Sequence, residues 1–289
     1  MILAAGAFET PRLMLGQTGA PEGGLGNSSG LVGRNLMFHF QTLTVAAFPF
    51  RLHTMRGRCV TAAHDDSIVG DEAQQAAARA AGLPWIRGGL TEHGGGNQPV
   101  SEAKLYGSGR HHGAAMRDSS LRDRLWVFTV QGEDLAQPTN RIDLDPTVRD
   151  AWGLPAGRVT YRPHRHELVL SDHVAPAHEA IMRDAGAEWV HTTTSPPVDG
   201  PDQRSGRMAD HSTPASYHIM GTCRMGTDAA TSVVDPEGHL WDVDNVLVAD
   251  SSVFPTSAGY NPTLTLVSVA HRFARQLIGE PLAATSPHP

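Results

Sequence analysis

The chain has 289 residues, a net charge of −7, 40% hydrophobic residues and 18% charged residues. This length fits one large domain or two modest ones, and the apolar content is sufficient for packed cores. The acidic balance argues against a nucleic-acid-binding protein, which needs a basic face to neutralise phosphates. The two cysteines, Cys59 and Cys223, exclude a disulfide framework and argue against a cysteine-based zinc site.

The sequence shows neither a membrane span nor a signal peptide. No apolar run approaches the roughly eighteen residues that a membrane helix requires. The first residues are apolar, but no basic region precedes them, and Glu9 and Pro11 interrupt the run early. The location stays open, with cytoplasmic as the default expectation, because the true N-terminus of the protein is expected upstream of this chain.

The N-terminal segment predicts a strand, a tight turn and a short helix. Residues 2–7 form an apolar run that ends at Gly6. Thr10 suits a helix N-cap, Pro11 suits the first helical position, and Gly19 suits the C-terminal end. The Gly-rich stretch 20–35 predicts irregular structure.

The middle of the chain alternates between strand patterns and weakly patterned stretches. Residues 52–120 predict loops and an insertion, and residues 195–213 predict a loop. A helix is expected over 173–187, with Val174, Ala177, Ile181 and Ala185 on one face. Strands are expected over 42–48, 125–131 and 141–146. Residues 158–163 and 166–172 indicate either further strands or a strand that leads into a helix.

The C-terminal segment has the clearest pattern. Residues 246–249 predict a buried strand that ends at Asp250. Asn261 and Pro262 open a helix with one apolar stripe, and Gly279 and Pro281 end it. The stripe comprises Leu266, Val269, Ala270, Phe273 and Leu277.

Several weaker motifs do not support a function of their own. No G-x-G-x-x-G or G-x-x-x-x-G-K-[ST] loop occurs anywhere in the chain. The G-x-S-x-G pattern around Ser28 follows a Gly-rich loop instead of the strand that a hydrolase nucleophile needs. His164 and His166 would share a face of a strand, but no third metal ligand has a good case, so we expect solvated histidines and no metal.

A strand that ends at Asp250 beside a helix starting near Asn261 is where α/β folds place anionic ligands. His218 precedes a Gly-containing turn and could be carried to the same place. These residues alone leave two alternatives open: an active site, or a helix cap with a structural histidine.

The same residues carry a resemblance to a known family. The segments SYHIMGTCRMG at 216–226 and DSSVFPTSAGYNPT at 250–263 resemble the C-terminal motif of glucose–methanol–choline (GMC) oxidoreductases. LAAGAFETPRLML at 3–15 resembles the second signature of that family, and GLVGRNL at 30–36 resembles its continuation. The chain departs from that signature at residues 18–21.

The resemblance implies a fold of mixed α/β and α+β character. A partial, Rossmann-like FAD-binding domain would be interleaved with a substrate domain built on an antiparallel sheet. We expect residues 1–38 and 213–289 in the FAD-binding domain, and residues 39–212 in the substrate domain. The N-terminal FAD-binding motif of the family would lie upstream of Met1, so this chain would be the C-terminal portion of a longer enzyme and inactive alone.

The resemblance also implies a chemistry, hydride transfer from an alcohol, sugar or polyol carbon to flavin N5. His218 would take or stabilise the hydroxyl proton, and Asn261 would orient the substrate oxygen. Residues that would help hold FAD are Ala4, Gly6, Asp250, Ser251, Pro262 and Thr263. Cys223 has no assigned chemistry. The alternative is a non-catalytic remnant, and the substrate, the electron acceptor and the oligomeric state stay open.

Overall fold

The computed structural model describes residues 1–17, 19, 23–54, 60–95, 103, 108–193 and 216–280. The chain divides into two compact units. Unit 1 comprises Met1–His39, Asp134–Arg162 and Tyr217–Pro289, and unit 2 comprises Phe40–Glu133 and Pro163–Ser216. Residues 134–162, which the prediction placed in the segment 39–212, cluster with unit 1, and the assignment of FAD-binding and substrate domains stays a prediction.

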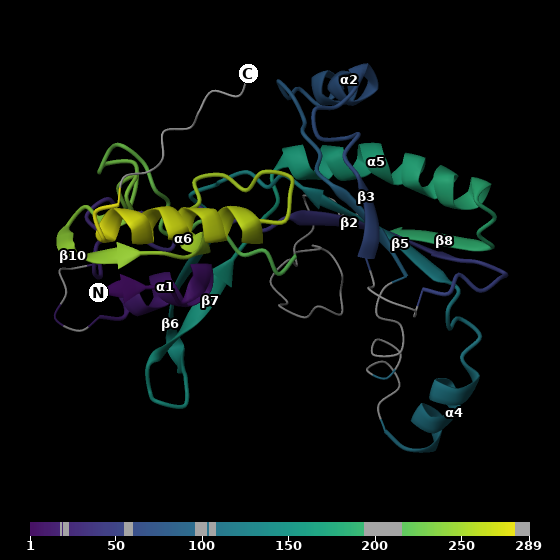
Figure 1. The fold of residues 1–289 in the computed structure, drawn as a ribbon, viewed down its shortest axis with the longest axis horizontal. Helices are drawn as coiled ribbons and strands as arrows, with labels where there is room; N and C mark the ends of the chain where they lie inside the picture. The colour runs from purple at the N-terminus through teal and green to yellow at the C-terminus, as the bar shows by residue number, and fades with distance from the viewer. Residues whose placement is uncertain are drawn as a thin grey trace. The chain divides into compact units, whose positions relative to one another are not determined.

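Unit 1 contains a small mixed sheet, a β-hairpin and two principal helices (Figure 1). The sheet has the order β1-β10-β9, and β1 pairs parallel to β10 with Ile2 opposite Leu247 and Leu3 opposite Val248. The elements are β1 (Ile2–Leu3), α1 (Gly6–Leu15), β6 (Arg141–Arg149), β7 (Pro155–Thr160), β9 (His239–Leu240), β10 (Val243–Val248), the 3₁₀ turn η2 (Ser251–Val253) and α6 (Thr263–Leu277). Strands 141–146 and 246–249 and the last helix are thereby confirmed.

Helix α1 differs from the prediction because it begins at Gly6, with Ala5 as N-cap, and not after Thr10. Gly6 has a positive φ of 83°, which a residue without a side chain adopts easily and which turns the chain sharply out of β1. Pro11 lies inside the helix, and the C-cap is Gly16. The first turn is thus set by glycine geometry and a distant carboxylate, described below, and not by a local capping sequence.

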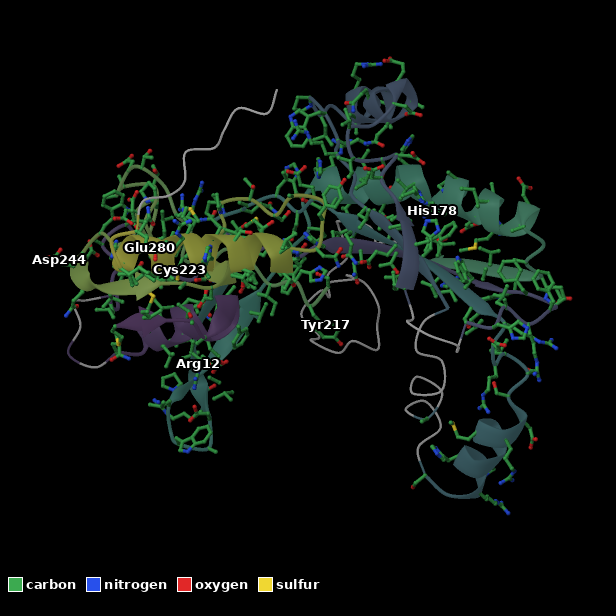
Figure 2. The ribbon with its side chains drawn as sticks, in the orientation of Figure 1. Arg12, His178, Tyr217, Cys223, Asp244 and Glu280 are labelled. Carbon is green, nitrogen blue, oxygen red and sulfur yellow. The ribbon has the colours of Figure 1, made fainter. Side chains whose placement is uncertain are left out.

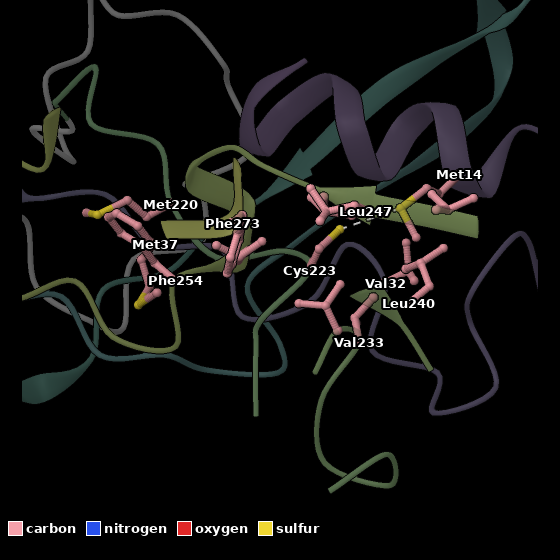
Figure 3. Packing of buried hydrophobic residues seen from close by; sticks show 14 residues of the cluster. Met14, Val32, Met37, Met220, Cys223, Val233, Leu240, Leu247, Phe254 and Phe273 are labelled. Carbon is pink, nitrogen blue, oxygen red and sulfur yellow. Dashed lines mark hydrogen bonds between the residues drawn. The ribbon is translucent and has the colours of Figure 1, made fainter. Parts of the chain in front are cut away.

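The core of unit 1 brings together segments from both ends of the chain (Figure 3). Met14 of α1, Leu247 of β10 and Phe273 of α6 are each 3% exposed or less. Leu266 and Val269 pack against the same cluster, so the expected stripe of α6 faces the core along much of its length. Leu277 departs from it, with half of its surface exposed.

Unit 2 is built on an antiparallel five-stranded sheet with the order β3-β4-β5-β2-β8. Its central pair has Phe40 opposite Gly132 and Ala47 opposite Leu125. The strands are β2 (Phe40–Ala47), β3 (Val60–His64), β4 (Thr91–Gly94), β5 (Leu125–Gly132) and β8 (Trp189–Thr193). The predictions of strands near 42–48 and 125–131 are confirmed.

The long helix α5 (Arg165–Asp184) contacts β2, β5 and β8. It begins earlier than predicted and includes the stretch 166–172, which is helical and not extended. The expected apolar face is wrong, since Ala177 and Ile181 are exposed. The buried face instead includes the polar residues Glu167, Ser171 and His178, and the Thr42 hydroxyl of β2 donates to Ser171 Oγ at 2.8 Å.

The weakly patterned stretch 52–120 is more ordered than the sequence suggests. It contributes β3, β4 and the helices α2 (Glu72–Ala80) and α4 (Arg110–Asp118). The loop predicted over 195–213 and residue Cys59 lie outside the described residues. Within the part of the chain that the structure describes, no helix is both long and apolar enough to cross a membrane.

Candidate active site

The parallel strands β1 and β10 end side by side, and Asp250 lies two residues after the end of β10. The Asp250 carboxylate is buried, with 6% of the residue exposed. Its Oδ2 accepts hydrogen bonds from Gly6 N at 3.0 Å and from the Thr10 hydroxyl at 2.6 Å, and its Oδ1 accepts from Ser252 N at 2.8 Å. Asp250 therefore fixes the start of α1 and the turn η2 in one network.

The two halves of the C-terminal motif lie against each other. Gly221 N donates to Ser251 O at 3.1 Å, and Cys223 N donates to Ser252 O at 2.9 Å. Gly221 has φ +75°, and a Cβ there would lie 2.1 Å from Asn35 O, so only glycine permits this approach of the backbones. The segment after His218 is thus fixed to the segment after Asp250.

The other expected cofactor contacts cluster at the same strand ends and at the start of α6. Ala4 is exposed between β1 and α1, and Ser251 is half-buried in η2. Helix α6 begins at Thr263 with Pro262 as its N-cap, and no side chain caps this end. Asn261, which was expected to open this helix with Pro262, precedes the N-cap and is exposed, so it is not the capping residue.

His218 is half-buried beside the exposed Tyr217, which Figure 2 labels. The structure pairs it with His39, a fully buried histidine that the sequence analysis did not single out. Their Nδ1 atoms lie 3.0 Å apart, and the rings meet edge to face with centroids 4.9 Å apart and an interplanar angle of 75°. The hydrogen bond joins residues 179 positions apart in the sequence.

A second buried carboxylate, Asp134, connects the His39 segment to the loop before α6. Phe38 N donates to Asp134 Oδ2 at 2.6 Å, and the Tyr161 hydroxyl donates to the same carboxylate at 3.0 Å. Asp134 N donates to Ser257 Oγ at 2.8 Å, and this hydroxyl donates to Asp134 O at 3.0 Å. Asp134 thus ties the neighbour of His39 to the loop that leads to Asn261.

Cys223 is a core residue with no exposed surface, and its Sγ lies 3.8 Å from Met14 Sδ. Burial, followed by the nearby Asp250 carboxylate, raises the pKa of the Cys223 thiol to about 12. A thiol that stays protonated near neutral pH is a poor nucleophile. The position suits a packing role.

The weaker sequence motifs also have structural roles. Ser28 is exposed, and its hydroxyl donates to Asp242 Oδ1 at 2.5 Å. His164 is the N-cap of α5, where its Nδ1 accepts from His166 N at 3.1 Å. Among the described residues, no group of three or more His, Cys, Asp or Glu side chains is arranged to hold a metal ion.

Comparison with known proteins identifies the family. The model for the C-terminal part of GMC oxidoreductases matches residues 136–270. The 2-methyl-1,2-propanediol dehydrogenase of Mycolicibacterium austroafricanum is 30% identical over 281 residues, covering 94% of this chain and 46% of that protein. The chain belongs to the GMC oxidoreductase family. Paromamine 6'-oxidase of Streptomyces fradiae is 28% identical over 298 residues, covering 99% of this chain and 47% of that protein.

This GMC oxidoreductase chain spans less than half the length of these two relatives. Among solved structures, formate oxidase has a TM-score of 0.63 and 15% identity over 96% of this chain and 54% of its own. Pyridoxine 4-oxidase from Mesorbium loti has a TM-score of 0.60 and 18% identity over 97% and 52%. At these identities the likeness shows a shared fold, one that combines helices with an antiparallel sheet.

Proposed function

We propose that this chain forms part of an FAD-dependent oxidoreductase that acts on CH–OH groups of alcohols, sugars or polyols. One observation carries the proposal: the segment that contains His218 is hydrogen-bonded to the segment after Asp250, within the unit that contains the ends of β1 and β10. The relatives are named as a propanediol dehydrogenase and a paromamine oxidase, and the first of these names supports a substrate with a CH–OH group.

The residues present fit a flavin. Ligands of open α/β sheets bind beyond the carboxyl ends of parallel strands, and here those ends carry the exposed Ala4 and the half-buried Ser251. The start of α6 has no side-chain cap, so its N–H groups at Thr263 and beyond are suited to negative charge. We assign Ala4, Ser251 and Thr263 to FAD binding through their backbone groups, and Gly6 and Pro262 through the turn and the helix start that they form.

Asp250 contributes to the same site indirectly. Both of its carboxylate oxygens accept hydrogen bonds from the chain, so its role in FAD binding is to fix the backbone of Gly6 and Ser252. We therefore do not assign the Asp250 carboxylate a direct contact with FAD. Its oxygens already accept hydrogen bonds from buried donors of the chain, and they hold those donors in place.

When bound, FAD supplies the acceptor for the hydride that leaves the alcohol carbon. His218 takes the hydroxyl proton, a form of general-base help typically worth about 10²–10⁴ in rate. The Asn261 amide orients the substrate oxygen, and the positive end of α6 favours the negative charge that reduction places nearby.

The glycine-rich loop that grips a dinucleotide pyrophosphate is not among the residues of this chain. We propose that a dinucleotide-binding segment completes the site, either as part of a longer polypeptide or as a separate chain. Residues 1–289 by themselves would then retain no FAD and show no activity.

Visible spectra test this proposal in two steps. Purified residues 1–289 with added FAD should remain colourless after desalting, and the same chain combined with its dinucleotide-binding segment should be yellow. Anaerobic addition of an alcohol, sugar or polyol from a panel should then bleach the flavin band. A flavin-loaded protein that no member of the panel bleaches would favour the non-catalytic remnant over the enzyme.

A further inference from the structure

The rings of His39 and His218 contact each other through their Nδ1 atoms, and only one of these two atoms can carry a proton. Two Nδ1 atoms 3.0 Å apart form a hydrogen bond only if one carries hydrogen and the other offers its lone pair. The contact therefore fixes opposite tautomers on the two rings, and it accommodates one imidazolium but not two.

The backbone holds this pair in register. Met37 and Met220 form an antiparallel bridge, with Met37 N donating to Met220 O at 3.0 Å and Met220 N donating to Met37 O at 2.9 Å. His39 lies two residues after one bridge residue, and His218 lies two residues before the other. In an antiparallel pair these positions are opposite each other on one face.

The His39 side of the pair is the more buried one. His39 is fully buried, both methionines of the bridge are fully buried in the core, and Phe38 is tied to Asp134. His218 is only half-buried. A ring held on all sides by packing is suited to orient a ring that meets the substrate.

We propose that His39 is a positioning residue that sets the tautomer and ring orientation of His218, an inference that rests on the proposed role of His218 as the base. His218 carries hydrogen on Nδ1 and donates it to His39 Nδ1, which leaves the basic lone pair of His218 on Nε2. His39 then carries its hydrogen on Nε2. When the hydroxyl proton moves to His218 Nε2, the hydrogen bond to His39 persists and stabilises the imidazolium.

Two substitutions of similar shape separate this role from packing. In His39→Asn the amide oxygen takes the place of Nδ1 and can accept from His218, whereas in His39→Leu a methyl group stands there. His39→Leu should slow flavin reduction about 10–100-fold with little change in KM, the range typical for loss of a group that orients a histidine. His39→Asn should restore the rate to within about threefold of the parent, since it restores the acceptor.

A readout that needs no flavin is the ring ¹⁵N spectrum of the histidine-labelled chain, with His218 assigned from its loss in His218→Gln. The parent should show hydrogen on His218 Nδ1, His39→Asn should keep it there, and His39→Leu should shift the population toward Nε2–H. A parent spectrum with His218 as the Nε2–H tautomer overturns the proposal, as does equal flavin reduction in the Leu variant and the parent. If the tautomers are as proposed but His218→Gln reduces flavin at the parent rate, the proposed function fails while the pairing stands.

Discussion

Replacement of Asp250 by alanine should unfold the N-terminal edge of unit 1 selectively. The carboxylate is buried and accepts from Gly6 N, the Thr10 hydroxyl and Ser252 N. In Asp250→Ala these three donors lose their acceptor at once. The start of α1 has no side chain of its own to replace it, because Ala5 is the N-cap.

The size of the effect follows from the three donors. A buried donor left without an acceptor costs about 1–3 kcal/mol, and loss of the three hydrogen bonds, one of them only partly buried, should total roughly 3–5 kcal/mol. Thr10→Val removes one donor and keeps the shape, so we expect about 1.5–3 kcal/mol, the range for a hydrogen bond to a charged group.

Amide hydrogen exchange measures the effect locally. Peptides from α1 and β10 should lose protection in Asp250→Ala, while peptides from α5 in unit 2 should keep theirs. The matched control is Asp242→Ala, which likewise removes a carboxylate. This carboxylate accepts two hydrogen bonds, both from the exposed Ser28. The control should change stability by less than about 1 kcal/mol. Protection of α1 in Asp250→Ala within about 1 kcal/mol of the parent would refute the argument.

Four further predictions concern single residues. Burial, followed by the His64 and His93 rings, lowers the pKa of His178 from 6.5 to about 4, so the unfolded state binds the extra proton between these values. The contribution of neutral His178 to the free energy of unfolding should be fully present above pH 6.5 and fall by about 3 kcal/mol as the pH drops to 4. Urea melts of His178→Gln should show a shallower fall over this range. The same pH dependence in the variant and the parent would contradict this role of His178. Gly221→Ala should destabilise unit 1 by about 3 kcal/mol or more, since its Cβ would meet Asn35 O at 2.1 Å; a calorimetric scan that matches the parent would exclude the steric argument. Asn261→Asp should preserve folding but lower turnover, because it places negative charge beside a flavin that becomes anionic, and equal turnover would remove Asn261 from the site. Cys223 should resist thiol reagents in the native protein and react only on unfolding, and rapid native labelling would contradict its burial.

The sequence predicted the parts of the fold whose signals are local. Helix α6 has an apolar stripe that includes Leu266 and Phe273, and the strand before Asp250 is a continuous apolar run. Both were located within a few residues because propensity and packing favour the same boundaries.

The misplaced elements depend on distant partners. Helix α1 begins at Gly6 because a carboxylate 244 residues away accepts its N–H, and no neighbouring residue signals this bond. The buried face of α5 includes Glu167 and His178, so a search for apolar periodicity selects the wrong face. Tertiary contacts override the local pattern in both cases.

The candidate site divides in the same way. His218 and Asn261 stand in motifs that the sequence displays, whereas His39 becomes relevant only through the antiparallel bridge between Met37 and Met220. Asp134 likewise joins the site through Phe38 and Ser257, which are far from it in sequence. The register of a strand pair depends on both strands, so the sequence of one strand does not predict it.

The central claim is that His218 takes the proton of the substrate hydroxyl, and anaerobic rapid mixing of the flavin-loaded protein with an alcohol tests it most directly. His218→Ala should reduce its flavin at least about 10²-fold more slowly than the parent, which is the lower bound for general-base catalysis. His271→Ala, at an exposed histidine of α6, should leave the rate unchanged. A rate for His218→Ala within about tenfold of the parent would contradict the claim.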